Sequence, residues 1–91
     1  MGTATMIVRH QVQDYSAWRA VYDSLEDLRQ SYSCTGAEVM TDPGNKNDVI
    51  VIHRFPALEA AQGFGGSSEL KEAMGRAGVT GAPRIEIAAE A

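Results

Sequence analysis

Two histidines are the side chains of this 91-residue chain best suited to acid–base chemistry. His10 and His53 are its only histidines, and imidazole is the side chain that titrates closest to neutral pH. Each lies on an expected β-strand, and His53 directly follows the apolar run Val49–Ile52. If the two strands are neighbours, both histidines share one face, where they could act as general acid or base. The alternative is that each is a hydrogen-bonded histidine at the edge of the core.

Three aromatic side chains accompany the histidines. Trp18 and Tyr22 belong to the apolar stripe of one expected helix, and Phe64 lies near the end of another. Small-molecule pockets are mostly apolar and aromatic, with a few polar groups. We therefore interpret His10 and His53 as candidate catalytic residues, and Trp18, Tyr22 and Phe64 as candidate ligand-binding residues. A stripe of this kind is also typical of plain helix core, and that alternative stays open.

Other kinds of site are weakly represented. The single cysteine, Cys34, excludes an internal disulfide and fits a reducing compartment. One cysteine and two distant histidines predict no metal site unless carboxylates or a second chain contribute. Gly63, Gly65 and Gly66 lack the spacing of a dinucleotide-binding loop and indicate a flexible connector. A net charge of −4 and a pI near 5.0 argue against nucleic acid as a partner.

The length and the start of the chain give three further expectations. A chain of 91 residues predicts one domain spanning 1–91. No apolar run approaches the roughly 20 residues of a membrane span, and residues 1–5 lack the features of a signal peptide. We therefore expect a cytoplasmic protein without a membrane partner. A domain this small buries only roughly 60–65% of its unfolded surface, so association would help its stability.

Periodicity predicts the elements that position the candidate residues. Strands are expected over 4–11, 34–41, 48–55 and 84–89, and helices over 15–33 and 57–64, with a last helix that begins at Ser67 or Ser68. Asp14 is the expected N-cap of the first helix, and Gly78 suits the left-handed position that ends the last one. Residues 42–47 predict a hairpin loop with a positive φ at Gly44, and 81–83 a second loop.

This order is the split β-α-β pattern of an α+β, ferredoxin-like βαββαβ fold. Right-handed crossovers place the first and third strands in the middle of a four-stranded antiparallel sheet, with the helices on one face. The other face then carries Ile7, Ile50 and Ile52 or the alternating set. Leaving such side chains in water forgoes roughly 1.5–3 kcal/mol each. A second copy, packed sheet against sheet, is the simplest cover and predicts a homodimer.

Two arginines are expected on the same face as this apolar set. Arg9 and Arg54 could bind a carboxylate or phosphate. Pairing with Glu38 and Glu86, across strands or across the dimer, is the preferred interpretation because these acids occupy the same kind of position.

The sequence resembles small proteins of the dimeric α+β barrel superfamily, and most closely its antibiotic-biosynthesis-monooxygenase-like members. The resemblance is carried by residues 6–18, by Leu58-Glu-Ala-Ala and by residues 68–79, and it extends over nearly the whole chain. It implies a ferredoxin-like subunit whose sheet packs on that of a second copy. It also supports a role for His10.

The activities that the resemblance implies are varied. The superfamily holds cofactor-free monooxygenases that oxidise polycyclic phenols, haem-degrading enzymes, isomerases and proteins without known activity. The haem degraders carry a helical histidine after the third strand, whereas residues 57–78 contain none. The monooxygenases carry asparagine and tryptophan near the pocket, whereas here Asn45 and Asn47 lie in or beside the hairpin and Trp18 lies on the first helix.

The leading hypothesis is a homodimer with one pocket per chain. The pocket would bind an aromatic or quinone-like small molecule and oxidise it without a bound cofactor. One alternative is a non-catalytic ligand-binding or stress-related protein that uses the same pocket. The other is a structural dimer whose cavity is filled by its own side chains.

Overall fold

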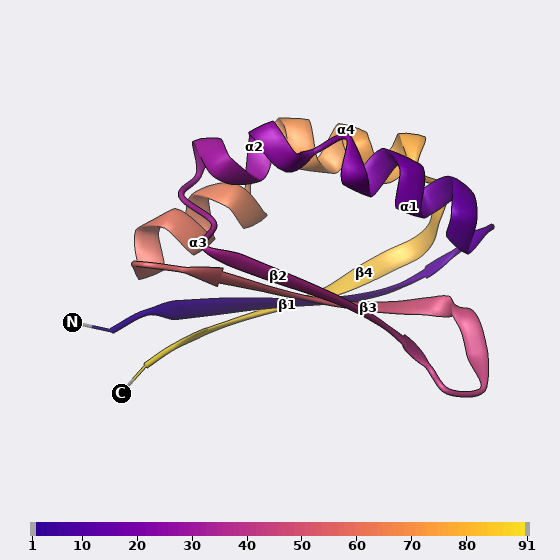
Figure 1. Cartoon of the computed structure of the whole chain (residues 1–91), viewed down its shortest axis with the longest axis horizontal. Coiled ribbons are helices and arrows are strands. Elements are labelled where there is room, and N and C mark those ends of the chain that lie inside the picture. The colour runs from indigo at the N-terminus through magenta and orange to yellow at the C-terminus, as the bar shows by residue number, and fades with distance from the viewer. Residues whose placement is uncertain (1, 91) are drawn as a thin grey trace.

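The computed structural model describes residues 2–90, which form one antiparallel sheet with all of its helices on one face (Figure 1). In chain order the elements are β1 (Ala4–Val12), α1 (Tyr15–Asp23), α2 (Glu26–Ser31), β2 (Gly36–Asp42), β3 (Asn45–Phe55), α3 (Leu58–Gly65), α4 (Ser68–Arg76) and β4 (Val79–Ala89). The four strands are ordered β2-β3-β1-β4. The predicted ferredoxin-like α+β fold is confirmed, with β1 and β3 in the middle of the sheet.

The register of β1 and β3 brings the two histidines to the same face. Met6 pairs with His53, Val8 with Val51 and His10 with Val49. Side chains alternate along a strand, and the even-numbered positions of β1 are buried under the helices while Ile7 is only partly buried. The predicted assignment of the two faces of β1 is confirmed.

The helix predicted over 15–33 is broken into α1 and α2. The break lies at Ser24 and Leu25, where the Ser24 hydroxyl donates to the Val21 carbonyl at 2.6 Å and Leu25 leaves helical geometry (φ −95°, ψ 13°). At the start of α1, Asp14 caps as predicted by accepting from the Ala17 N–H at 2.9 Å. The break lets the chain bend over the sheet while the apolar stripe keeps facing it.

The hairpin between β2 and β3 is tighter than predicted. β3 begins at Asn45, so only Pro43 and Gly44 separate it from β2. The predicted positive φ at Gly44 is wrong, because among the described glycines only Gly78 and Gly81 have one. The Asp42 carboxylate accepts from the Gly44 N–H at 2.9 Å, and this contact holds the turn without a left-handed residue.

The last strand is longer than predicted, because β4 includes residues 79–83. Between the pairs Arg9–Arg84 and Gln11–Thr80 the register shifts, so the segment predicted as a loop is an irregularity within the strand, opposite His10. Gly81 has a φ of 71° there, and Gly78 has the predicted left-handed conformation at 80° after α4. Bulges of this kind accommodate extra residues without ending a strand.

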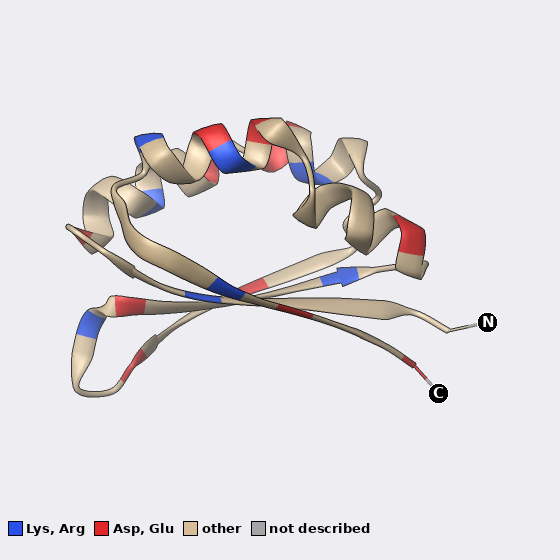
Figure 2. Ribbon diagram, turned by 180° about the vertical axis from the view of Figure 1, so that it is seen from behind, with Lys and Arg blue, Asp and Glu red and all other residues tan. Residues whose placement is uncertain are grey.

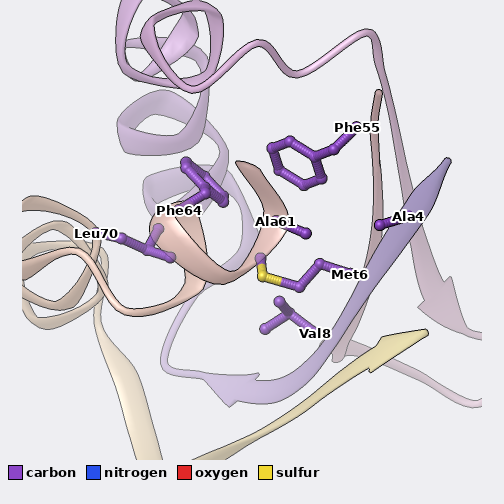
Figure 3. Close-up of a cluster of buried hydrophobic side chains, with 7 residues drawn as sticks. All are labelled: Ala4, Met6, Val8, Phe55, Ala61, Phe64 and Leu70. Atoms are coloured by element: carbon purple, nitrogen blue, oxygen red, sulfur yellow. The ribbon is translucent and has the colours of Figure 1, made fainter. Parts of the chain in front are cut away.

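Two clusters of apolar side chains join the sheet to the helices. The first, drawn in Figure 3, brings β1 and β3 against α3 and α4 through Ala4, Met6, Val8, Phe55, Ala61, Phe64 and Leu70. The second surrounds Trp18 with Val12, Val49, Val51 and Ala77. Both clusters lie between the sheet and the helix layer; in the strand register His53 pairs with Met6 of the first cluster and His10 with Val49 of the second.

No helix of the described residues covers the other face of the sheet, which we call the open face (Figure 1). Its middle carries Ile7 and Ile52, which pair with each other, and Ile50, which pairs with Met40. The isoleucines are partly buried and Met40 is 43% exposed. The predicted apolar set on this face is thus present within the described chain.

Ion pairs surround this apolar set, and Figure 2 shows the charged positions of the strands as short segments between uncharged ones. The Arg54–Glu38 pair is present as predicted. Arg9 instead contacts Asp48 at 2.7 Å and Asp42 at 3.4 Å. Glu86 contacts Arg84 of its own strand at 3.2 Å and does not pair with Arg9 within residues 2–90, so pairing across the dimer stays a prediction.

Candidate functional site

A small cavity lies between the sheet and the helix layer and has a volume of about 30 Å³. The five candidate residues His10, His53, Trp18, Tyr22 and Phe64 all line it. The remaining lining is apolar except for one arginine, described below. Residues from two strands and four helices therefore meet between the sheet and the helices, where the sequence predicted a cavity.

His10 is buried without a polar partner. It is 6% exposed, and neither ring nitrogen has a hydrogen-bond partner among the described residues. Burial lowers its pKa, and the nearby charge of Asp48 offsets part of that effect. The indole of Trp18 meets the ring edge-on, with the centroids 5.7 Å apart. His10 is thus a neutral imidazole whose donor and acceptor are both unused.

His53 has one partner and one unused nitrogen. It is 3% exposed, its Nε2 lies 3.2 Å from the Tyr22 hydroxyl, and its Nδ1 has no partner in residues 2–90. Burial, with a smaller effect of the Arg29 charge, lowers the pKa of His53 to about 4. Burial also raises the pKa of Tyr22, so its phenol stays protonated and can donate to Nε2. That arrangement places the ring proton of His53 on Nδ1.

Aromatic rings form the walls of the cavity. Trp18 and Tyr22 stack with their centroids 4.9 Å apart and their planes 17° apart. Phe64 meets His53 edge-on at 5.2 Å. The cluster is continuous from His10 to Phe64, which gives the cavity flat, polarisable surfaces of the kind that aromatic ligands contact.

Arg29 is a lining residue that the sequence analysis missed. Its guanidinium carbon lies 4.2 Å from the centroid of the Tyr22 ring, and its Nη1 donates to the Tyr22 carbonyl at 2.8 Å. Its spacing from Tyr22 could have predicted this position, since residues seven apart share a helix face. Tyr22, Leu25 and Arg29 follow that spacing, and the helix break does not destroy it.

The volume of the cavity limits what it holds without rearrangement. About 30 Å³ accommodates a water molecule, whereas a cavity that binds benzene measures roughly 150 Å³. Two larger depressions adjoin it on the outside. One of about 480 Å³, between α4 and β4, shares Met74 with the cavity, and one of about 270 Å³ shares Arg29. An aromatic ligand therefore requires one of these side chains to move.

Residues 2–90 contain neither a metal-ligand cluster nor a membrane-spanning helix. No group of three or more His, Cys, Asp and Glu side chains in that range is placed to hold a metal ion. No helix formed by the described residues has the length and hydropathy needed to cross a membrane.

Comparison with known proteins gives matches in structure alone. No family model matches the sequence, and no curated protein matches it. A proposed antibiotic biosynthesis monooxygenase from Bordetella bronchiseptica superposes with a TM-score of 0.82 at 12% identity, covering 100% of this chain and 99% of that one. One from Caulobacter crescentus gives 0.76 at 18% identity, covering 96% and 88%.

A third similar structure is SnoaB, a cofactor-independent oxygenase from Streptomyces nogalater. It superposes with a TM-score of 0.74 at 10% identity, covering 94% of this chain and 92% of that one. At these identities the likeness establishes the fold. The structural resemblance implied by the sequence is confirmed: the chain has the ferredoxin-like α+β fold of the antibiotic biosynthesis monooxygenase structures.

Proposed function

We propose that the protein is a homodimeric, cofactor-independent monooxygenase that acts on an aromatic or quinone-like small molecule, with one pocket per chain. The observation that carries the proposal is the pair of neutral, buried histidines beside a cavity with aromatic walls. Three of their four ring nitrogens, Nδ1 and Nε2 of His10 and Nδ1 of His53, have no partner in the described chain. Leaving such groups unpaired costs roughly 1–3 kcal/mol each, and a ligand with hydroxyl or carbonyl groups would satisfy them.

The chemistry of such a reaction assigns a role to His10. Without a bound cofactor, the electrons that reduce dioxygen must come from the substrate itself. Loss of a phenolic proton to a base makes the substrate electron-rich enough to supply them. His10 is the proposed base because both of its nitrogens are free, whereas Nε2 of His53 is engaged by Tyr22. Trp18, Tyr22 and Phe64 would hold the substrate ring.

A second copy of the chain is the proposed partner. The apolar middle of the open face and the ion pairs around it suit an isologous contact between two sheets. The fold shared with the neighbours reported above is compatible with that assembly. A cytoplasmic location, one domain over 1–91 and the absence of a nucleic-acid partner belong to the same proposal.

A non-catalytic ligand-binding protein is the second candidate. The lowered pKa values of both histidines favour it, because burial makes each imidazole a weaker base and so a less effective proton acceptor. The cavity, the aromatic walls and the unused nitrogens would serve binding equally well.

The test is oxygen consumption with a panel of polycyclic phenols, in which ¹⁸O₂ reports the transfer of one oxygen atom to the product. His10→Ala should abolish turnover and leave the oligomeric state unchanged, since His10 lies on the helix side of the sheet. Full turnover in that variant would remove the catalytic role of His10. Saturable binding by the native protein without oxygen uptake would replace the enzyme with the second candidate.

A further inference from the structure

Arg29 is a cation without a counter-ion at the cavity. It is the one charged side chain in the described lining. Its guanidinium carries five N–H donors, and its one hydrogen bond within residues 2–90 is to the Tyr22 carbonyl. No carboxylate of the described chain pairs with it. Of the five other arginines, four have such a partner (Arg9, Arg19, Arg54 and Arg84), and the fifth, Arg76, is exposed to solvent.

The position of the Arg29 guanidinium is fixed by two contacts. The 2.8 Å hydrogen bond to the Tyr22 carbonyl holds one nitrogen, and the guanidinium lies over the Tyr22 ring at 4.2 Å. Tyr22 is itself stacked on Trp18. Holding an arginine in place in this way reduces the entropy that it loses on binding a ligand.

A purely structural role explains only part of this arrangement. The Tyr22 carbonyl lies next to the break between α1 and α2, and Arg29 satisfies it from the second helix. One neutral N–H donor would do the same without placing a positive charge in a half-buried site. Removing a charge from water without a partner is costly, so the charge itself calls for an explanation.

The Arg29 charge also acts inside the cavity. It contributes to the lowered pKa of His53, and it opposes the rise in the pKa of Tyr22 that burial causes. On the outer side, Arg29 lines the depression of about 270 Å³ together with Glu26, Gln30, Cys34 and Thr35. A ligand ring in the cavity could thus place a negatively charged substituent next to the guanidinium, with the exposed Glu26 as the nearest competing acid in this depression.

We propose that Arg29 binds an anionic oxygen of the ligand. The preferred ligands are aromatic compounds that carry a carboxylate or an ionised hydroxyl, with the ring between the aromatic walls and the anion on the guanidinium. This inference rests on the proposed pocket and narrows its ligand class. It assigns Arg29 a role in specificity and leaves the proton transfer to His10.

The test compares 2-naphthoate with 2-naphthol at pH 7 by isothermal titration calorimetry. The two share one ring system, but the carboxylate is ionised at this pH and the phenol is not. The indole N–H resonance of Trp18, the only tryptophan, reports whether binding occurs in the cavity. The native protein should prefer naphthoate. Arg29→Gln should weaken naphthoate binding by about tenfold or more and leave naphthol binding nearly unchanged.

Arg19→Gln is the matched control. Arg19 lies 5.8 Å from the centroid of the same Tyr22 ring, pairs with Asp23 and is absent from the cavity lining. Its variant should leave the binding of both ligands unchanged. Arg29→Lys should retain a preference for naphthoate because it keeps the positive charge, although it loses the planar guanidinium.

The outcomes separate the two levels of the argument. Binding of naphthol with equal or weaker binding of naphthoate by the native protein would overturn the role of Arg29 and leave the pocket standing. An equal loss of both ligands in Arg29→Gln, with unchanged thermal unfolding, would also overturn it. Binding of neither ligand to the native protein would remove the pocket and this inference together. The comparison on the native protein requires no variant to fold.

Discussion

The two histidines are held neutral by different surroundings. His10 keeps a nearby carboxylate, Asp48, but that group is itself paired with Arg9 at 2.7 Å. His53 accepts from a protonated phenol and feels the positive charge of Arg29. Burial favours the uncharged imidazole at both sites, and Asp48 offsets part of that effect at His10. The two sites therefore differ in hydrogen bonding. One ring nitrogen of His53 has a partner, whereas neither nitrogen of His10 has one among the described residues.

The lowered pKa of His53 makes stability depend on pH. Its folded-state pKa of about 4, against an ordinary value of 6.5, means that the unfolded chain binds the proton more tightly. The contribution of neutral His53 to the free energy of unfolding is therefore fully present above about pH 6.5, and it is lost as the pH falls from there toward 4. Its full size is about 3 kcal/mol. Urea unfolding between pH 4 and pH 7.5 should show this decline.

His53→Gln is the control for that measurement, because glutamine is polar and does not titrate. The free energy of unfolding of the variant should vary less over the same pH range. His10 contributes in the same direction, since its pKa is lowered as well. An identical pH dependence in the variant and the native protein would show that His53 is not the group responsible.

At the scale of helices and strands, alternation and helical spacing predicted the faces of β1 and β3 and the N-cap at Asp14. They failed at the break between α1 and α2, because the apolar stripe continues across it. The break depends on contacts that periodicity does not encode, such as the Ser24 hydroxyl on the Val21 carbonyl. Arg29 was missed for a related reason, since a charged residue on a helix is usually solvated.

The ends of strands were also hard to predict. Gly81 and Pro83 interrupt the alternation, so β4 was predicted to begin only after them. The structure keeps pairing through that segment because a register shift absorbs the extra residues opposite His10. Neither the shift nor the volume of the cavity can be read from residue types, because both depend on how β1 and α4 are spaced in three dimensions.

Two glycines should respond oppositely to alanine. Gly75 lies in α4, and a Cβ there meets no atom within 4 Å, so Gly75→Ala should stabilise the protein by about 0.5–1 kcal/mol. Gly81 has equally open surroundings but a φ of 71°, so Gly81→Ala should destabilise it by about 1–2 kcal/mol. Thermal unfolding of both variants tests the pair, and shifts of the same sign would contradict the backbone argument.

At the scale of the whole molecule, the sheet has two unlike faces. Helices cover one face except at the edge strand β4, where Ile85 and Ile87 are partly exposed, and the other face carries an apolar middle bordered by ion pairs. An apolar patch with a polar border is the usual composition of a protein–protein contact. The charges along its border would fix the relative rotation of two sheets, and the isoleucines would supply the burial.

The proposed dimer predicts a specific effect of charge on this face. Ile52→Lys should shift the native dimer toward monomer, because the lysine would be buried at the contact. Ile85→Lys is the control: Ile85 pairs with Val8 on the helix side of the sheet edge and is 37% exposed. Sedimentation equilibrium at micromolar concentration distinguishes the two. A monomeric native protein, or an unaffected Ile52→Lys dimer, would remove the sheet-to-sheet contact.

The central position of β1 also has a consequence during protein synthesis. This strand is made before both of its partners: it pairs with β3 and, through Ala4 and Ala89, with the end of β4. At about 5–20 residues per second, its neighbours arrive only after several seconds. During that time Met6 and Val8 have no sheet to join. The sheet is therefore complete only once β4 has been made, and until then the apolar side chains of β1 stay exposed to chaperones.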